Sequence, residues 1–163
     1  MPLAPAITDL EHLKERSAVA ALLAWRPDAV QQARFDHDEL TIWLEPSAIR
    51  EACALLRDEL QFNFLASITA VDWHPTHPRF EVVYHLLSIT RKDRVRLKVR
   101  VGDDNAELES VISVWLAANF FEREVFDLFG VRFSGHPYLR RIMMPDDWEG
   151  HPLRKDYPVE GYR

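Results

Sequence analysis

Acidic side chains gather in the last third of the chain, where Glu122, Glu124 and Asp127 precede His136. Carboxylates and a histidine at such spacing could act as general acid and base groups. Two features favour a structural role instead. Arg123 and Asp127 are four residues apart, which is the spacing of an ion pair within a helix, and acids near a helix N-terminus are stabilised by its dipole. We therefore expect these acids to solvate a helix, or to pair with nearby arginines, rather than to catalyse a reaction.

Two other clusters have the residue types of a metal site. The histidines of His74–His77 follow Asp72 at ligand-like spacing, and His85 could lie nearby. They belong to a Pro-rich loop without a clear third ligand, so we expect hydrogen bonding rather than metal binding. The two aspartates of Pro145–Trp148 could bind magnesium, but a proline directly before them favours a type I turn with that proline at its second position.

The sequence lacks the residues and motifs that usually bind redox cofactors. Cys53 is the single cysteine, whereas an iron–sulfur cluster normally needs about four thiolates. Cys53 also lies on an apolar helical face, where a small buried side chain is expected. Only Gly102 precedes Gly130, so no Gly-rich loop can approach a pyrophosphate. We expect no metal, flavin, nicotinamide, cluster or nucleotide on this chain.

A basic stripe raises the question of nucleic-acid binding. Val95, Leu97, Val99 and Val101 alternate with four basic residues, which are Arg94, Arg96, Lys98 and Arg100. This pattern predicts a strand with one apolar and one basic face. RNA-binding sheets present aromatic side chains for base stacking, and this strand has none. Since the net charge is −6, we expect a solvated or partner-facing surface and no nucleic acid.

The remaining periodicities predict the elements that position these residues. The 163 residues, 47% of them hydrophobic, can form one domain with a proper core. A first helix is expected to begin at a capping box, Thr8–Glu11, with Thr8 as N-cap, and to end near Trp25. A second is expected from Pro46 or Ser47 to Leu60. A weak helix is expected over 107–119, and another over 120–129 that ends at a Gly130 cap. Strands are expected at 30–35, 40–44, 64–71 (buried on both faces), 80–89 and 94–101. This order predicts an α+β domain, residues 1–129, with a mainly antiparallel sheet and packed helices.

The segment from 130 to 163 has a different character. Four of the five glycines and four of the ten prolines lie after Phe129, which argues against regular structure. A disordered linker is normally poor in large apolar residues. This segment contains Tyr138, Leu139, Ile142, Met143, Met144, Trp148, Leu153 and Tyr157. We therefore expect an extended, irregular C-terminal arm that docks on a partner, and a domain that stays folded without it.

The same segment resembles one family closely, the C subunit (30 kDa subunit) of the proton-pumping NADH–quinone oxidoreductase, respiratory complex I. The family signature is filled by Glu122, Arg123, Glu124, Asp127, Leu128, Phe129, His136, Arg140, Arg141 and Ile142. The stretch from Pro145 to Pro158 is similar to the family's usual ending, and Thr69–Asp72 is similar to its strand motif.

This resemblance implies a non-catalytic subunit of the peripheral arm, packed against the D subunit of the complex and close to its B subunit. It implies that the iron–sulfur clusters, FMN and the quinone site belong to partner subunits. The complex would lie at the inner (plasma) membrane, with this chain peripheral and on the cytoplasmic side. The longest apolar run, Val111–Phe121, is too short to span a bilayer, so we expect attachment through partners. The expected partner-interface residues are Glu122, Arg123, Glu124, Asp127, His136, Arg140, Arg141, Asp147, Trp148, Arg154, Lys155, Asp156 and Tyr157.

Three alternatives stay open at this point. The chain could be the equivalent subunit of a related membrane-bound hydrogenase or plastid-type dehydrogenase. It could be a stand-alone enzyme that uses Glu122, Glu124 and His136, or a sheet that binds nucleic acid.

Overall fold

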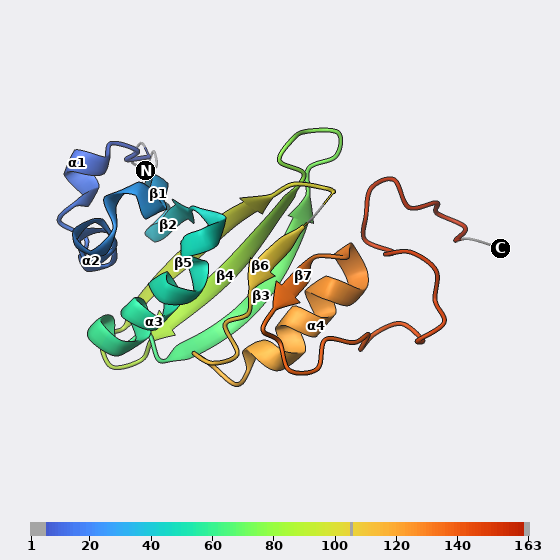
Figure 1. The fold of residues 1–163 in the computed structure, drawn as a ribbon. Coiled ribbons are helices and arrows are strands. Elements are labelled where there is room, and N and C mark those ends of the chain that lie inside the picture. The colour runs from blue at the N-terminus through green and yellow to red at the C-terminus, as the bar shows by residue number, and fades with distance from the viewer. Residues whose placement is uncertain (1–5, 105, 162–163) are drawn as a thin grey trace.

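The computed structural model of this chain describes residues 6–104 and 106–161, in which four α-helices and two sheets form an α+β fold (Figure 1). Residues 1–5 of the predicted domain and residues 162–163 of the predicted arm lie outside the described residues. The helices are α1 (Leu10–Leu13), α2 (Ser17–Trp25), α3 (Ile49–Leu60) and α4 (Ala118–Phe129), with short 3-10 turns η1 (Pro27–Ala29) and η2 (Pro46–Ala48). The strands are β1 (Val30–Asp36), β2 (Glu39–Leu44), β3 (Phe64–Asp72), β4 (Phe80–Ser88), β5 (Asp93–Val101), β6 (Glu107–Glu109) and β7 (Arg132–Ser134).

The main sheet has the strand order β1-β2-β5-β4-β3. Neighbours in it are antiparallel except for β2 and β5, which run parallel, so the sheet is mixed and mainly antiparallel, as predicted. The β1–β2, β3–β4 and β4–β5 hairpins account for the antiparallel pairs. The parallel pair arises because α3 and the next two strands intervene between β2 and β5.

The core lies between one face of this sheet and the helices (Figure 1). Strand β4, between β5 and the edge strand β3, directs Phe80, Val82, Tyr84 and Leu86 into it, as their alternation predicts. On α3 the buried side chains include Cys53, whose burial raises the pKa of the thiol. Cys53 is therefore the inert filler expected from its helical face.

Several local predictions were wrong for identifiable reasons. The N-cap of α1 is Asp9 rather than Thr8, because the Asp9 carboxylate accepts the N–H of Glu11. Strand β3 is buried on one face only, with Leu65 and Ile68 inward and Phe64 exposed.

Residues 107–119 do not form a weak helix. The stretch begins with strand β6 and continues as a turn in which the carbonyl of Val111 accepts the N–H groups of Val114 and Trp115. Helix α4 then begins at Ala118 and ends at Gly130, which adopts the predicted left-handed conformation with φ +78°.

The first residues of the predicted arm belong to the folded core. Strand β7 pairs in parallel with β6, and Val131 and Phe133 are buried. The irregular part of the arm therefore begins after Ser134, although the predicted division places its start at Gly130.

Candidate partner interface

The arm follows helix α4 from its first turn to its last and then reaches the β3–β4 end of the sheet. His136 lies at Asn119, where its Nε2 donates to the carbonyl and its Nδ1 accepts the N–H of Tyr138. The N–H of Leu153 donates to the carbonyl of Leu128 at the other end of α4. A Cβ atom at Gly130 would lie only 2.6 Å from the side chains of the arm residues His151 and Arg154, so only glycine fits under the arm here.

Asp127 anchors the middle of the arm from within α4. Its side chain is fully buried, and its Oδ1 lies 2.6 Å from Nη1 of Arg141. Its Oδ2 accepts the N–H groups of Ile142, Met143 and Met144 at 2.9, 2.7 and 2.9 Å. Burial opposes ionisation, but these hydrogen bonds outweigh it and hold the pKa of Asp127 below its usual range. The carboxylate therefore stays charged and fixes three consecutive peptide groups.

Arg123 and Arg141 complete this anchor. Arg123 donates to the carbonyl oxygens of Arg140 and Arg141, so the predicted ion pair between Arg123 and Asp127 within the helix is wrong. Arg141 also donates to the carbonyls of Trp148 and Gly150. The charged residues of this motif therefore bind the arm to its own domain.

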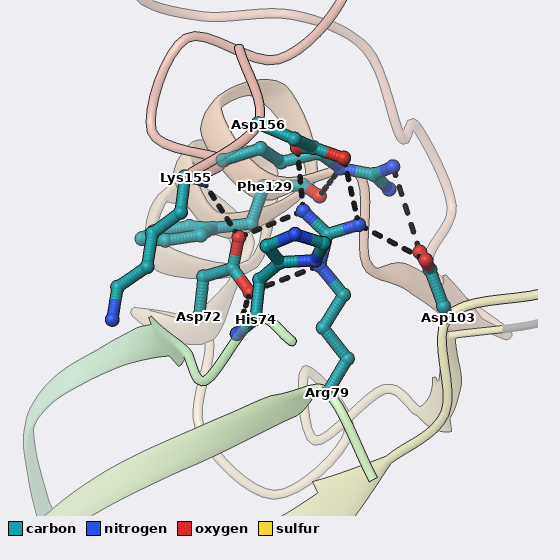
Figure 2. A network of polar contacts seen from close by, with 8 residues as sticks. Asp72, His74, Arg79, Asp103, Phe129, Lys155 and Asp156 are labelled. Atoms are coloured by element: carbon teal, nitrogen blue, oxygen red, sulfur yellow. Dashed lines mark hydrogen bonds and ion pairs between the residues drawn. The ribbon is translucent and has the colours of Figure 1, made fainter. Parts of the chain in front are cut away.

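The distal part of the arm docks on a second polar cluster, which Figure 2 shows from close by. At its centre is Arg79, which is 3% exposed and binds Asp72 through two hydrogen bonds of 2.9 and 2.8 Å. Arg79 also binds Asp103 at 2.9 Å and the arm residue Asp156 at 2.5 and 3.1 Å. The N–H of Lys155 donates to the second oxygen of Asp72 at 2.8 Å.

This distal cluster joins three separate parts of the chain. Arg154 adds a hydrogen bond from Nε to the carbonyl of Phe129 at 2.6 Å and lies 3.8 Å from Asp103. Burial opposes the ionisation of Asp72, yet the hydrogen bonds from the side chain of Arg79 and from the backbone N–H groups of Lys155 and His74 hold the pKa of Asp72 well below its usual range. The cluster therefore stays ionised and holds the arm on the sheet.

Glu122 is neither at the surface nor paired with an arginine. It is fully buried, and its carboxylate accepts the hydroxyl of Ser110 at 2.6 Å and the N–H of Val111 at 2.7 Å. Burial raises the pKa of Glu122 to about 7 despite these two hydrogen bonds. Glu122 therefore holds the turn after β6 against α4, whereas its neighbour Glu124 is exposed.

The other predicted interface residues lie along the same segment. Pro145 begins a turn, in which its carbonyl accepts the N–H of Trp148, so the proline occupies the first position and not the second. Asp147 in this turn is exposed. Arg140 lies 4.3 Å over the ring of Tyr138, and the hydroxyl of Tyr157 donates to the carbonyl of Glu149.

The side chains that the sequence-based site did not emphasise are the apolar ones on the outside. We call them the apolar ridge, and they are between 37% and 83% exposed. They are Leu116 just before α4, Phe120 in its first turn, and Tyr138, Ile142, Met143, Trp148 and Leu153 in the arm. The signal in the sequence was the excess of large apolar residues in an irregular segment. The structure shows that several charges of the arm, at Arg141, Arg154 and Asp156, bind within the chain, whereas many of its apolar side chains lie on the outside.

The catalytic and metal hypotheses find little geometry to support them. Glu122 binds Ser110 whereas His136 binds Asn119, so the two side chains do not form one site. The carboxylate of Asp72 is bound by Arg79. Within residues 6–104 and 106–161, no group of three or more His, Cys, Asp or Glu side chains could hold a metal ion. None of the helices described is long and apolar enough to cross a membrane.

Comparison with known proteins gives a consistent set of relatives. Residues 42–163 match the family model described as respiratory-chain NADH dehydrogenase, 30 kDa subunit. The chain is 46% identical over 149 residues to the C subunit of NADH-quinone oxidoreductase from Roseiflexus sp. (strain RS-1), covering 90% of this chain and 86% of that protein. It is 50% identical over 124 residues to the protein of the same name from Geobacter sulfurreducens, covering 76% of each chain.

Two solved structures share the fold. A trypsin-resistant fragment of Nqo5 has a TM-score of 0.66 and 32% identity, over 75% of this chain and 99% of the fragment. A chain of the membrane-bound sulfane sulfur reductase, an archaeal respiratory membrane complex, has a TM-score of 0.76 and 30% identity, over 90% of this chain and 86% of that one.

Proposed function

Because this chain belongs to the 30 kDa subunit family of the respiratory-chain NADH dehydrogenases, we propose that it binds the D subunit of that complex through its apolar ridge and arm. The chain is the structural, non-catalytic C subunit of an NADH–quinone oxidoreductase, the respiratory complex I. Its role in the proposal is to hold the D subunit, with the B subunit nearby, where electrons from NADH reach quinone.

The main support for the proposal is that the arm exposes large apolar side chains while some of its charged side chains bind within the chain. Arg141 of the arm pairs with Asp127, and Asp156 of the arm pairs with Arg79, so these two arm charges do not need a partner outside the chain. The exposed side chains of Met143, Trp148 and Leu153 have no such explanation in an isolated chain. Exposed apolar patches on a soluble protein commonly mark interfaces. Aromatic residues and methionine are also enriched in interface cores.

The redox centres are assigned in this proposal to the partner subunits. Cys53 is the single cysteine of the chain and is buried, whereas a cluster needs about four thiolates. The proposed place of the chain is peripheral, on the cytoplasmic side of the inner (plasma) membrane, attached through its partners.

The rival functions have weaker support. Glu122 is buried and engaged, so a stand-alone enzyme would have to work without it. The likeness to the sulfane sulfur reductase is to a related respiratory complex, but relatives that are 44–50% identical carry the name of the NADH–quinone oxidoreductase.

A tagged chain expressed in its own cells, with gentle purification from native membranes, tests the proposal. We expect the D and B subunits to co-purify in equal amounts with this chain, together with NADH–quinone activity. A preparation that contains the chain without the D subunit would refute the partner assignment. Hydrogen- or sulfur-dependent activity in place of NADH oxidation would favour the related complexes.

A further inference from the structure

The sheet face opposite the core carries charges arranged in cross-strand rows. The pairing places Arg34 beside Thr41 and Thr41 beside Arg96, and it places Arg100 beside Glu81. Helices α3 and α4 lie against the other face (Figure 1). Five basic and three acidic side chains share the open face, so its net charge is positive by two on a chain of net charge −6; they are Arg34, Arg94, Arg96, Lys98 and Arg100 with Asp36, Glu39 and Glu81.

Glu81 fixes the centre of this face. It is 1% exposed, because Lys98, Arg100 and Trp43 lie over it. Their nitrogen atoms lie 2.8, 3.1 and 3.2 Å from its carboxylate oxygens. Burial opposes ionisation, but these hydrogen bonds outweigh it and lower the pKa of Glu81. The two cations are thus held in place by one shared carboxylate and keep an excess positive charge.

Aromatic rings brace the same cations. Lys98 lies 5.3 Å from the ring centre of Trp43, and Arg100 lies 5.6 Å from that of Trp73. Such cation–π contacts restrict the side chains without neutralising them. Lys98 and Arg100 are therefore held in place before any ligand binds, so less entropy is lost when they bind an anion.

Two guanidinium groups on this face keep free donors. Arg100 uses only Nε for Glu81, and its Nη atoms make no hydrogen bond with any described residue. The guanidinium of Arg94 is exposed and has no carboxylate partner within residues 6–104 and 106–161. Six residues separate them along β5, which corresponds to about 20 Å in an extended strand.

We propose that this open face is a second docking surface, which receives a segment of a neighbouring subunit that carries carboxylates about 20 Å apart along β5. The inference rests on the proposed function in one respect, that the chain has neighbouring subunits. Arginine forks bind carboxylates in a bidentate geometry, which suits an acidic polypeptide. The apolar ridge supplies affinity, whereas the cationic face orients the encounter and speeds association.

The test is the rate at which purified chain enters membranes prepared from cells that lack it, followed as recovery of NADH–quinone activity. The double variant Arg94→Gln with Arg100→Gln leaves Glu81 bound by Lys98 and Trp43, so it should still unfold in one cooperative thermal transition, at a somewhat lower temperature than the wild type because buried Glu81 loses one cation. The matched control, Arg26→Gln with Arg50→Gln, changes the net charge equally at α2 and α3, away from this face.

We expect the face variant to enter roughly fivefold or more slowly at about 20 mM KCl, and the difference to shrink at about 300 mM KCl, because salt screens exposed charges. The control should enter at the wild-type rate. Equal rates for the face variant and the wild type, or equal slowing in the control, would overturn the inference alone. Failure of the wild type to enter would overturn the proposed function and this inference together. Salt-sensitive binding of a single-stranded RNA that the face variant loses would assign the surface to nucleic acid instead.

Discussion

The carboxylate of Asp127 accepts one hydrogen bond from Arg141 and three from consecutive backbone amides, so a single side chain orders the middle of an irregular arm. The variant Asp127→Asn removes the charge and one acceptor oxygen while keeping the size of the side chain. Hydrogen bonds to charged groups contribute about 1.5–3 kcal/mol each. We expect trypsin to cleave after Arg140 or Arg141 roughly tenfold faster or more, because cleavage follows the open population.

The global melting temperature of this variant should change much less than the cleavage rate, because Asp127 holds the arm rather than the sheet. The control is Asp147→Asn, an exposed acid of the same arm. Unchanged trypsin cleavage in Asp127→Asn would show that the arm does not depend on this carboxylate.

Glu122 gives the second prediction, on pH. Its pKa is raised to about 7 in the folded chain, above the ordinary value near 4.3, because burial disfavours the charged form. The folded state therefore binds the proton more tightly than the unfolded state. The stability from this group is fully present below the unfolded pKa and is lost as the pH rises through about 7.

The variant Glu122→Gln cannot ionise, but its amide oxygen can still accept from Val111 or Ser110. Between about pH 5 and pH 8 we expect the free energy of unfolding of the wild type to fall relative to this variant, by on the order of 3 kcal/mol at most. Urea denaturation at both pH values measures the difference. Glu124→Gln, on the exposed side of the same helix, should track the wild type, and a parallel pH profile for Glu122→Gln would contradict the burial argument.

Residue spacing located these acids but not their roles. The motif placed Glu122 and Asp127 on one helix, and a four-residue spacing makes an Arg123–Asp127 pair the simplest expectation. In the structure Asp127 binds Arg141, 14 residues away in sequence, and Glu122 binds Ser110, 12 residues away. Such partners depend on how β6, α4 and the arm pack, which no local pattern encodes.

At the scale of elements, strong hydrophobic periodicity was sufficient to predict a strand or a helix from the sequence, and weak periodicity was not. Strand β5 alternates strictly from Arg94 to Val101, strand β4 is mostly apolar, and the structure has both strands. The stretch 107–117 is short, and its form is set by Glu122, which binds Ser110 and the backbone of Val111. Strand β7 was missed because three residues carry too little pattern for a strand, and its pairing with β6 is a long-range event.

The boundary between domain and arm leads to the third prediction. A chain that stops at Gly135 keeps β7 and the buried side chains of Val131 and Phe133. It loses the arm, whose apolar packing against the core is limited to partly buried groups such as Leu139, and with it the hydrogen bonds of the arm to Asp127 and Asp72. We expect a single cooperative thermal transition close to that of the full chain.

A chain that stops at Phe129 serves as the comparison for this prediction. It loses β7 and should unfold at lower temperature or without cooperativity, because β6 and the core lose Val131 and Phe133. If the chain ending at Gly135 also lost its transition, the arm would be part of the domain and not an addition to it.

For the whole molecule, charged and apolar side chains are separated among three places: the contacts of the arm with the domain, the apolar ridge and the open sheet face. The inward charges of the arm and of the sheet end, at Arg141, Asp127 and Arg79, bind the chain to itself. The apolar ridge is left for a partner, and the open sheet face carries excess positive charge. The sequence alone predicts that arm charges such as Arg140 and Arg154 contact the partner. With Arg154 engaged inside the chain, we assign the central contacts to the apolar side chains beside them.

The last prediction follows from this distribution. Met143→Asp and Leu153→Asp place a carboxylate at positions that are 63% and 50% exposed in the isolated chain, so its melting temperature should change little. In an interface the same carboxylate would be buried without a partner, at a cost of several kcal/mol. We therefore expect both variants to be missing from the complex purified from membranes. Ile89→Asp, at an exposed apolar residue in the β4–β5 turn, and Arg96→Ala, on the open sheet face, should both assemble. Normal assembly of both ridge variants would mean that the apolar ridge is not the interface with the complex.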